Sequence, residues 1–464
     1  MSTQLTRSTH GRPAAPVRIL HVGLGNFMRA HQAWYTEKAS NADEWGIAAF
    51  TGRRPLMAEL LAPQDGLYTL ITKEAAGNSY EVISSIVAVH PASDFASFIG
   101  YFESSDLSIV TSTVTEVGYC RRPDGSLDLE DARVAADLEA LKELVGKEME
   151  LGSAELSTAP AKILAGLLAR RAAGVGPLTI LPCDNLPDNG SAFARVVADA
   201  AREVDPSIVQ WMVENVSWAT CMVDRITPAT SDADRDECEK VQGYADASPV
   251  PTEPFSEWVI SGDFPAGRPD WEVAGAQIVE DVEPYEQRKL WMLNGSHSLM
   301  AYAAPIFGHA TVADAIGDQV VRGWVQKWWE EAGSGLQVEW EDYAAALLAR
   351  YENPNIRHLL AQIAHDGSQK IPVRIAPTLI NQRTQGKLPV SAVKAVAAWM
   401  LHLQGYGAPV VDKSADKVAS QLNDNATKNA EVVLNYVAPE LSGDAELVTA
   451  IADAAEEILS FVKE

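Results

Sequence analysis

The fold of the N-terminal part of this 464-residue chain is decided by one stretch, Val17-Arg-Ile-Leu-His-Val-Gly-Leu-Gly-Asn-Phe-Met-Arg-Ala-His31. It opens with an apolar run that is typical of a buried strand and continues into the turn Gly23-Leu-Gly-Asn-Phe27. An amphipathic stretch from residue 29 to about residue 40 predicts a helix, and residues 45–51 predict a second strand. This order of strand, glycine turn, helix and strand predicts a βαβ unit, in which the two strands run parallel.

The same alternation continues beyond this unit. Further apolar, β-rich runs occur at residues 81–89, 107–113 and 178–182, with helical patterns between several of them. Residues 244–254 are rich in Pro and Ser and predict a loop. Because parallel strands need crossover connections, which are usually helices, the pattern predicts a mainly parallel sheet with helices on both faces.

Strand patterns fade beyond about Glu283. From there on the chain is rich in Ala and Leu and has helical periodicity, as in residues 342–351, 391–403 and 445–461. A chain of this length is also expected to divide into two domains. The sequence therefore predicts an α/β domain over residues 14–282, doubly wound and of the dinucleotide-binding Rossmann type, followed by an all-α domain over residues 283–464.

Charge and composition argue against several classes of partner. The formal net charge of −26 repels nucleic acid and anionic membranes, so we expect neither as a partner. The four cysteines lack CxxC spacing and the nine histidines form no HxxxH or HExxH pair, so we expect neither a disulfide framework nor a bound metal. No signal peptide and no membrane-spanning run is evident, which predicts a cytoplasmic protein.

The glycine turn is the first candidate for a ligand site. A GxG turn between a strand and a helix lets the main chain approach a pyrophosphate, and the helix N-terminus offers unpaired N–H groups. The turn residues that we expect to bind a dinucleotide are Gly23, Gly25, Asn26 and Phe27. Met28 occupies the position that usually holds a third Gly or Ala, so an ordinary tight turn is the alternative interpretation.

The end of the second predicted strand bears on which dinucleotide would bind. In dinucleotide folds an acidic residue in this region takes the ribose hydroxyls, but Thr51-Gly-Arg-Arg54 contains none. Arg53 and Arg54 would suit the 2′-phosphate of NADP or simply face solvent, so NAD and NADP both stay open. Glu116 follows the strand at residues 107–113, at the edge where ligands bind in doubly wound sheets, unless it only caps a turn.

The segment that is richest in candidate catalytic groups is Tyr285-Glu-Gln-Arg-Lys-Leu-Trp-Met-Leu-Asn-Gly-Ser-His-Ser-Leu299. On an α-helix, Lys289, Asn294 and His297 fall within an arc of about 140°, among apolar residues. Desolvation would let the lysine lose its proton near neutral pH and act as a general base for an alcohol. Asparagine N–H groups would hold the oxygen as negative charge develops on it. The alternative is that the three polar residues merely cap an interface.

The chain carries seven short motifs, spread over both predicted domains: GLGNFMRAH (23–31), QDGLYTL (64–70), TEVGY (115–119), CDNLPDNG (183–190), MVDRITP (222–228), KLWMLNGSHS (289–298) and NP (353–354) followed by DGSQKIP (366–372). Together, and in this order, they resemble the motifs of the polyol-specific long-chain dehydrogenases, which are also called the mannitol dehydrogenase family.

The resemblance implies catalytic roles for three residues. Lys289 corresponds to the family's catalytic lysine, which takes the proton from the carbinol during oxidation and returns it during reduction. Asn294 and Asn185 correspond to the asparagines that hydrogen-bond the reacting oxygen. A conformational role for Asn185 is the alternative, because it lies in a stretch that is rich in turn-forming residues.

It also implies binding roles. His297, Asp224 and Lys370 correspond to positions that contact the substrate, and Arg29 lies in the opening motif that we assign to the cofactor. Asp224 could instead form a local ion pair with Arg225.

The implied activity is that of a metal-independent NAD(P)-dependent dehydrogenase. A hydride would pass between C4 of the nicotinamide and a secondary carbinol carbon, interconverting a polyol and its ketose, with D-mannitol and D-fructose or a related hexitol or pentitol as the pair. The cofactor would be NAD, with NADP as the other option, and the protein would be a monomer.

Two alternatives stay open. The family's uronate branch reduces fructuronate to mannonate or tagaturonate to altronate, and Arg357, Lys370 and Arg374 are candidates to bind the carboxylate of such a substrate. A non-catalytic nucleotide-sensing protein is the alternative from another class.

Overall fold

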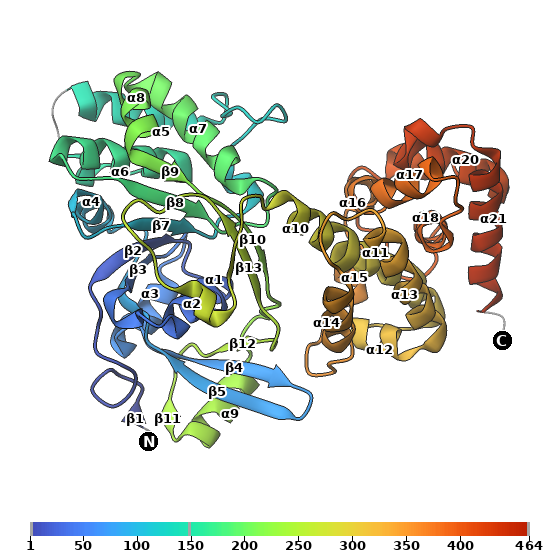
Figure 1. Cartoon of the computed structure of the whole chain (residues 1–464), viewed down its shortest axis with the longest axis horizontal. Helices are drawn as coiled ribbons and strands as arrows, with labels where there is room; N and C mark the ends of the chain where they lie inside the picture. The colour runs from blue at the N-terminus through green and yellow to red at the C-terminus, as the bar shows by residue number, and fades with distance from the viewer. Residues whose placement is uncertain (1–2, 147–149, 462–464) are drawn as a thin grey trace. The chain divides into compact units, whose positions relative to one another are not determined.

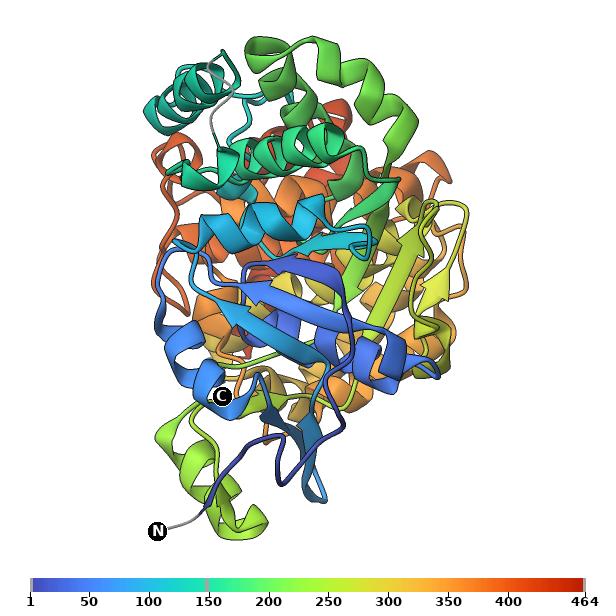
Figure 2. The same cartoon turned by 90° about the vertical axis from the view of Figure 1, so that its left-hand side faces the viewer.

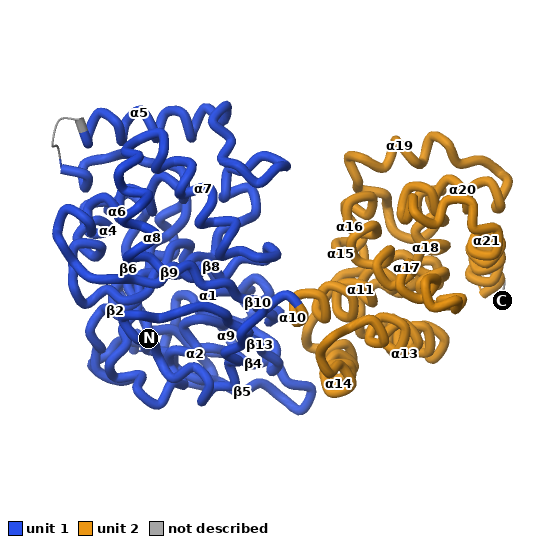
Figure 3. Tube along the Cα trace, turned by 45° about the horizontal axis from the view of Figure 1, so that its top comes forward, with its two compact units in different colours: residues 1–283 blue, residues 284–464 orange. Residues whose placement is uncertain are grey.

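The computed structural model describes residues 3–146 and 150–461 of the chain. It divides into two compact units, Met1–Glu283 and Pro284–Glu464, which are coloured separately in Figure 3. Each unit is described by itself.

A six-stranded, fully parallel sheet forms the centre of unit 1 (Figures 1 and 2). Its strands, in spatial order, are β6 (Ile86–His90), β3 (Gly46–Phe50), β2 (Val17–Val22), β7 (Ile109–Ser112), β8 (Leu178–Pro182) and β9 (Val216–Trp218). The chain builds outward from β2 in one direction and then returns to build outward in the other. This is the strand order of a dinucleotide-binding Rossmann fold, so the predicted fold class of the N-terminal part is confirmed.

Both faces of this sheet are covered. Leu20 and Val22 of β2 belong to a core that includes the inner faces of helices α4, α6 and α7. Ile19, which points to the other face, belongs to a second core with Met28 and Tyr35. The nine helices described in unit 1 are α1 (Asn26–Ala30), α2 (Gln32–Lys38), α3 (Leu56–Leu61), α4 (Phe95–Glu103), α5 (Ala132–Gly146), α6 (Ala159–Ala173), α7 (Asn189–Val204), α8 (Ser207–Asn215) and α9 (Asp232–Gln242).

Some local predictions were wrong. The run at residues 81–89 is not one strand, because it divides between β5 (Gly77–Ile83), which pairs antiparallel with β4 (Tyr68–Glu74), and β6 of the parallel sheet. The chain leaves one sheet for the other at Ser84, whose N–H and hydroxyl both donate to Glu37 at 2.9 Å.

The helix expected from residue 29 begins earlier, at Asn26, and is interrupted at His31, where φ is −120° and ψ is −89°. The loop expected at residues 244–254 contains two short strands, β11 (Tyr244–Ala245) and β12 (Val250–Thr252). β12 adds to β4, and β11 pairs with β1 (Thr3–Gln4). A further sheet consists of β10 (Thr220–Asp224), β13 (Glu257–Ser261) and β14 (Gln277–Ile278).

The described part of unit 2, up to residue 461, contains helices and no strand, which confirms the all-α prediction. After α10 (Glu283–Arg288) and the π-helix η6 (Lys289–Asn294), its helices are α11 (Gly295–Ala303), α12 (Val312–Gly317), α13 (Gln319–Gly333), α14 (Glu341–Tyr351), α15 (Leu360–Ile363), α16 (Gly367–Arg374), α17 (Ala376–Thr384), α18 (Val390–Leu403), α19 (Asp416–Ala419), α20 (Ala426–Val437) and α21 (Ala445–Ser460). No helix among the described residues is long and apolar enough to cross a membrane.

Candidate active site

The glycine turn after β2 has two glycines with different functions. Gly23 has a φ of +108°, and a Cβ there would lie 2.4 Å from the main-chain oxygen of Thr113, so only glycine fits. Gly25 is the opposite case, because a Cβ would meet nothing closer than the Gly23 oxygen at 3.6 Å. The first glycine makes the tight turn, and the second leaves space at the start of α1. The turn therefore fits a main chain that a pyrophosphate approaches closely.

A buried polar network supports this turn. The Thr113 hydroxyl donates to the Gly23 oxygen at 2.7 Å, and the His21 ring bridges Thr111 at 2.8 Å and Thr113 at 3.0 Å. Burial lowers the pKa of His21 to about 3, so the ring is neutral at physiological pH. His21 was missed by the sequence analysis, although a single polar residue inside an apolar strand is a signal that could have found it.

Two of the predicted cofactor residues are tied into the framework beneath the turn. Arg29 is fully buried, and it donates to the Gly25 oxygen at 3.2 Å, to the Ser248 oxygen at 2.6 Å and to the Asn26 side chain at 2.6 Å. The Asn26 amide donates in turn to the Pro228 oxygen at 3.2 Å. These contacts hold α1 in place beside the turn. Direct contact of either residue with a cofactor stays a prediction.

The other predicted cofactor residues lie along one edge of the sheet. Phe27 is half-buried in α1 and stacks on His31 with ring centroids 5.0 Å apart. Arg53 follows β3, and Glu116 begins the 3-10 helix after β7, and both side chains are exposed. Since β3 and β7 are the two neighbours of β2, the carboxyl ends of three adjacent strands bring the glycine turn, Arg53 and Glu116 to the same edge.

Asn185 is exposed on the loop that follows β8, and the residue before it anchors that loop. The buried Asp184 carboxylate accepts hydrogen bonds from the Val114 N–H at 2.5 Å, the Tyr119 hydroxyl at 2.6 Å and the Ser112 hydroxyl at 3.0 Å. Burial raises the pKa of Asp184 to about 6, although the three hydrogen bonds act in the opposite direction and lower this pKa. The loop that carries Asn185 is thereby held against the loop that carries Glu116.

Asp224 is the last residue of β10 and is 5% exposed. The neighbouring Arg225 guanidinium donates to main-chain oxygens, those of Ala30 at 2.5 Å and Glu253 at 3.2 Å. Arg225 therefore serves to join β10 to α1 and to the segment after β12. A substrate contact for Asp224 stays a prediction.

In unit 2, the segment with Lys289, Asn294 and His297 is helical as expected, but its first part is not an α-helix. Lys289–Asn294 form a π-helix, η6, and the N–H of Gly295 bonds to the oxygen of Leu290, five residues back. Because a π-turn has more residues per turn than an α-helix, it brings Asn294 closer to the face of Lys289, from which an α-helix would separate it by about 140°. His297 follows three residues later in α11, on the same face. The π-turn aligns the three residues more closely than the α-helical geometry assumed from the sequence.

His297 combines burial with an unsatisfied ring nitrogen. It is 6% exposed, and its Nε2 has no hydrogen-bond partner among the described residues. Burial lowers its pKa well below the usual value, and His358, Arg350 and Arg374 lower it further. The imidazole is therefore neutral, and its free nitrogen can bind a hydroxyl group of a ligand.

Lys370 and Arg374 of α16 are further polar groups near this face. Arg374 donates to the Ser298 hydroxyl at 3.2 Å and, at 3.5 Å, to the oxygen of Asn294. Lys370 donates to the oxygen of Ile363 at 3.2 Å. Burial lowers the pKa of both, and within residues 3–146 and 150–461 neither forms an ion pair with a carboxylate.

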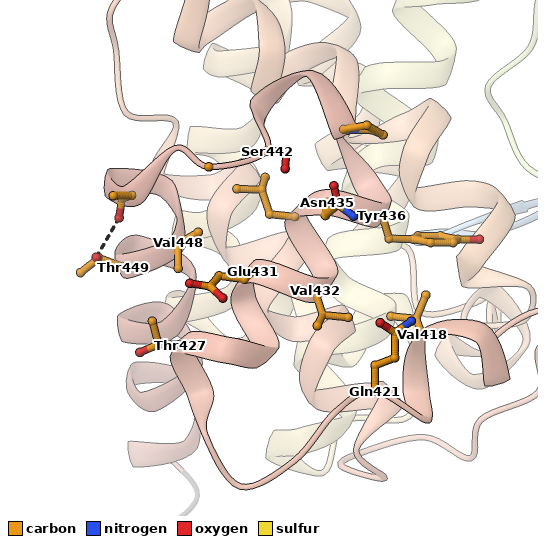
Figure 4. Close-up of a pocket in the computed structure, with 14 residues that line it drawn as sticks. Val418, Gln421, Thr427, Glu431, Val432, Asn435, Tyr436, Ser442, Val448 and Thr449 are labelled. Carbon is orange, nitrogen blue, oxygen red and sulfur yellow. Dashed lines mark hydrogen bonds between the residues drawn. The ribbon is translucent and has the colours of Figure 1, made fainter.

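Arg357, the third cationic candidate, is exposed. A separate hollow of about 810 Å³ lies among α19, α20 and α21 (Figure 4). Its polar lining consists of neutral side chains such as Asn435 and of the carboxylate of Glu431, and it includes none of the predicted site residues. It therefore does not belong to the candidate active site.

Models of known protein families match both units of this chain. The family model of the mannitol dehydrogenase Rossmann domain matches residues 17–273, and that of the mannitol dehydrogenase C-terminal domain matches residues 281–459. The D-mannonate oxidoreductase of Escherichia coli (strain K12) is 36% identical over 84% of this chain and 80% of its own. The mannitol 2-dehydrogenase of Cereibacter sphaeroides is 33% identical over 96% of this chain and 93% of its own.

Among solved structures, this chain is similar to the Pseudomonas fluorescens mannitol 2-dehydrogenase in its ternary complex with NAD and D-mannitol. The TM-score is 0.77, the identity is 28%, and 99% of each chain is covered.

Proposed function

Because the chain belongs to the mannitol dehydrogenase family, we propose that it is a nicotinamide-dependent oxidoreductase that interconverts a polyol and its ketose at a secondary carbinol. The first substrate pair to test is D-mannitol and D-fructose, and a related hexitol or pentitol pair is the next. The observation that carries the proposal is the π-turn that aligns Lys289, Asn294 and His297 on one helix face.

The proposed chemistry assigns a separate task to each residue. Lys289 accepts the carbinol proton during oxidation and returns it during reduction. The amides of Asn294 and Asn185 donate hydrogen bonds to the reacting oxygen, which stabilises the negative charge that develops on it. His297, with its free Nε2, and Asp224 bind hydroxyl groups along the polyol chain. No metal is needed for this scheme.

The cofactor that we propose is NAD, with NADP as the option to be tested. Gly23 and Gly25 fit a pyrophosphate at the turn, and Arg53 and Glu116 lie on the same edge of the sheet. When bound, the nicotinamide ring supplies or accepts the hydride at C4. If exposed Arg53 binds a 2′-phosphate, Arg53→Ala should raise KM for NADPH and leave that for NADH unchanged. Equal effects on both cofactors would show that Arg53 does not choose between them.

A second candidate function is favoured by Arg374. A half-buried guanidinium without a carboxylate partner is favoured by a ligand that supplies the counter-charge, and the carboxylate of a hexuronate would do so. The similarity to a D-mannonate oxidoreductase is in keeping with this candidate. Lys370, on the same helix, would add a second positive charge.

One experiment separates the candidates. The loss of NADH absorbance is followed in parallel with D-fructose and with D-fructuronate. Fast turnover of fructose alone supports the polyol reaction, whereas fast turnover of fructuronate alone supports the uronate reaction and makes Arg374 and Lys370 the carboxylate site. If both are inert, NADPH and pentuloses are tested next. Cofactor binding without turnover of any ketose or polyol would contradict the enzymatic proposal and support a nucleotide-sensing protein.

A further inference from the structure

The π-helix η6 depends on a hydrogen bond from outside the helix. In an α-helix the N–H of Gly295 would bond to the oxygen of Trp291, four residues back. Here this N–H bonds to the oxygens of Leu290 and Met292. The oxygen of Trp291 instead accepts the indole N–H of Trp328, at 2.8 Å. A side chain of α13 thus replaces the main-chain donor that the π-turn removes.

The next carbonyl groups along η6 have similar external donors. The indole of Trp329 donates to the Met292 oxygen at 3.2 Å, and the Tyr351 hydroxyl donates to the Leu293 oxygen at 3.2 Å. Trp328, Trp329 and Tyr351 are all buried, with exposed fractions of 0, 3 and 2%. The Ser296 hydroxyl also donates to the oxygens of Met292 and Leu293, so the Trp291 oxygen is the one for which the external donor matters most, and the side chains from α13 and α14 stabilise the turn together.

Gly295 makes room for the central donor of this set. A Cβ at residue 295 would lie 2.4 Å from Cζ2 and 2.9 Å from Nε1 of Trp328, although the main chain of Gly295 is helical and not strained. Glycine is costly inside a helix, so its presence here needs a reason. The reason is the close approach of the indole to the main chain of η6.

We propose that Trp328 is a positioning residue for the reaction, since its hydrogen bond to Trp291 maintains the π-turn that aligns Lys289 with Asn294. This inference rests on the proposed function, in which Lys289 is the base. Without the indole N–H, the turn can regain its α-helical hydrogen bond from Gly295 to Trp291. Lys289 would then lie about 140° around the helix from Asn294, away from the reacting oxygen.

The test is Trp328→Phe, which removes the N–H group and keeps an aromatic ring. We expect kcat to fall at least about tenfold, because a misplacement of about 1 Å can cost about 100-fold in rate. The KM for the cofactor should stay unchanged, and the pH at which polyol oxidation reaches half its maximal rate should shift, since Lys289 changes its surroundings. Hydrogen exchange of the main-chain amides between residues 290 and 296 should change, because the N–H of Gly295 moves from the oxygens of Leu290 and Met292 to that of Trp291.

The matched control is Trp324→Phe, on the same helix. The Trp324 ring packs against Phe307 and Phe461, at 5.8 and 6.0 Å between centroids, so its loss should leave kcat, the pH profile and the exchange of η6 unchanged. If Trp328→Phe does not fold, Tyr351→Phe removes a neighbouring donor and is measured in the same way.

The outcomes distinguish this inference from the proposed function. An inactive Lys289→Ala together with a fully active Trp328→Phe of unchanged pH profile would overturn the positioning role alone. An active Lys289→Ala would overturn the assignment of the base and the positioning role with it. Slower turnover with unchanged amide exchange would also contradict the inference, because the π-turn would then be intact.

Discussion

At the scale of single residues, Lys289 is the most direct test of the proposed chemistry. Polyol oxidation needs this lysine neutral and ketose reduction needs it protonated, so oxidation should rise with pH while reduction falls over the same window. Lys289→Ala should lower kcat by about 10²–10⁴-fold in both directions and leave cofactor binding intact. The exposed Lys327 of α13, replaced by Ala, is the control and should be fully active. Near-normal turnover of Lys289→Ala would exclude it as the base.

The raised pKa of Asp184 predicts that the free energy of unfolding depends on pH. Its pKa is raised from 3.8 to about 6 by burial, so the folded state holds its proton at pH values where the unfolded state has lost it. This stabilising contribution is complete below about pH 4 and is lost as the pH rises through 6, and a shift of about two units corresponds to about 3 kcal/mol. Urea unfolding of Asp184→Asn between pH 4 and 7 should lack this part of the pH dependence.

The control for this measurement is Asp43→Asn, on an exposed 3-10 turn, which should follow the wild-type curve. If Asp184→Asn also followed the wild-type curve, Asp184 would be ionised throughout the range from pH 4 to 7 in the folded protein.

At the scale of elements, the glycine turn after β2 leads to two contrasting predictions, one for each of its glycines. Gly25→Ala should leave the free energy of unfolding nearly unchanged, because the methyl group has room, but should weaken NADH binding by about tenfold or more, since it occupies the space left for the pyrophosphate. Gly23→Ala should instead destabilise the fold by at least about 1–3 kcal/mol through its positive φ and the contact with Thr113. Fluorescence titration with NADH and thermal unfolding measure the two effects. Undiminished NADH affinity in Gly25→Ala would place the pyrophosphate elsewhere.

The strands also show where a local sequence pattern gave a wrong prediction. The run at residues 81–89 has uniform β propensity, yet the contacts of Ser84 with Glu37 divide it between two sheets. Those contacts join residues far apart in the sequence, so no local window contains them.

At the scale of the whole molecule, the net charge of −26 is the dominant feature. Mutual repulsion of so many carboxylates opposes the compact state, and salt screens it, with a Debye length of about 10 Å at 0.1 M. We therefore expect the Tm to rise by several degrees between about 20 mM and 200 mM NaCl. KCl should act equally, because the effect is screening and not specific binding. A Tm that is flat or falls over this range would mean that attractive ion pairs outweigh the repulsion.

Local sequence was sufficient for the strand–glycine turn–helix unit at residues 17–31, for the parallel strands near residues 109 and 178, and for the helical character of the C-terminal part. These features follow from hydrophobic periodicity and from glycine positions, which a short window of sequence contains. The motifs that resemble the mannitol dehydrogenase family were sufficient to place Lys289, Asn185 and Asn294 among the candidates.

Long-range packing was required for the rest. The unpaired nitrogen of His297, the raised pKa of Asp184 and the unneutralised charge of Arg374 all depend on which distant side chains surround a group. The π-turn is the clearest case, because residues 289–294 have no local feature that favours it over an α-helix. It exists because the indole of Trp328, 37 residues further along the chain, binds the one carbonyl that the wider turn leaves without its usual donor.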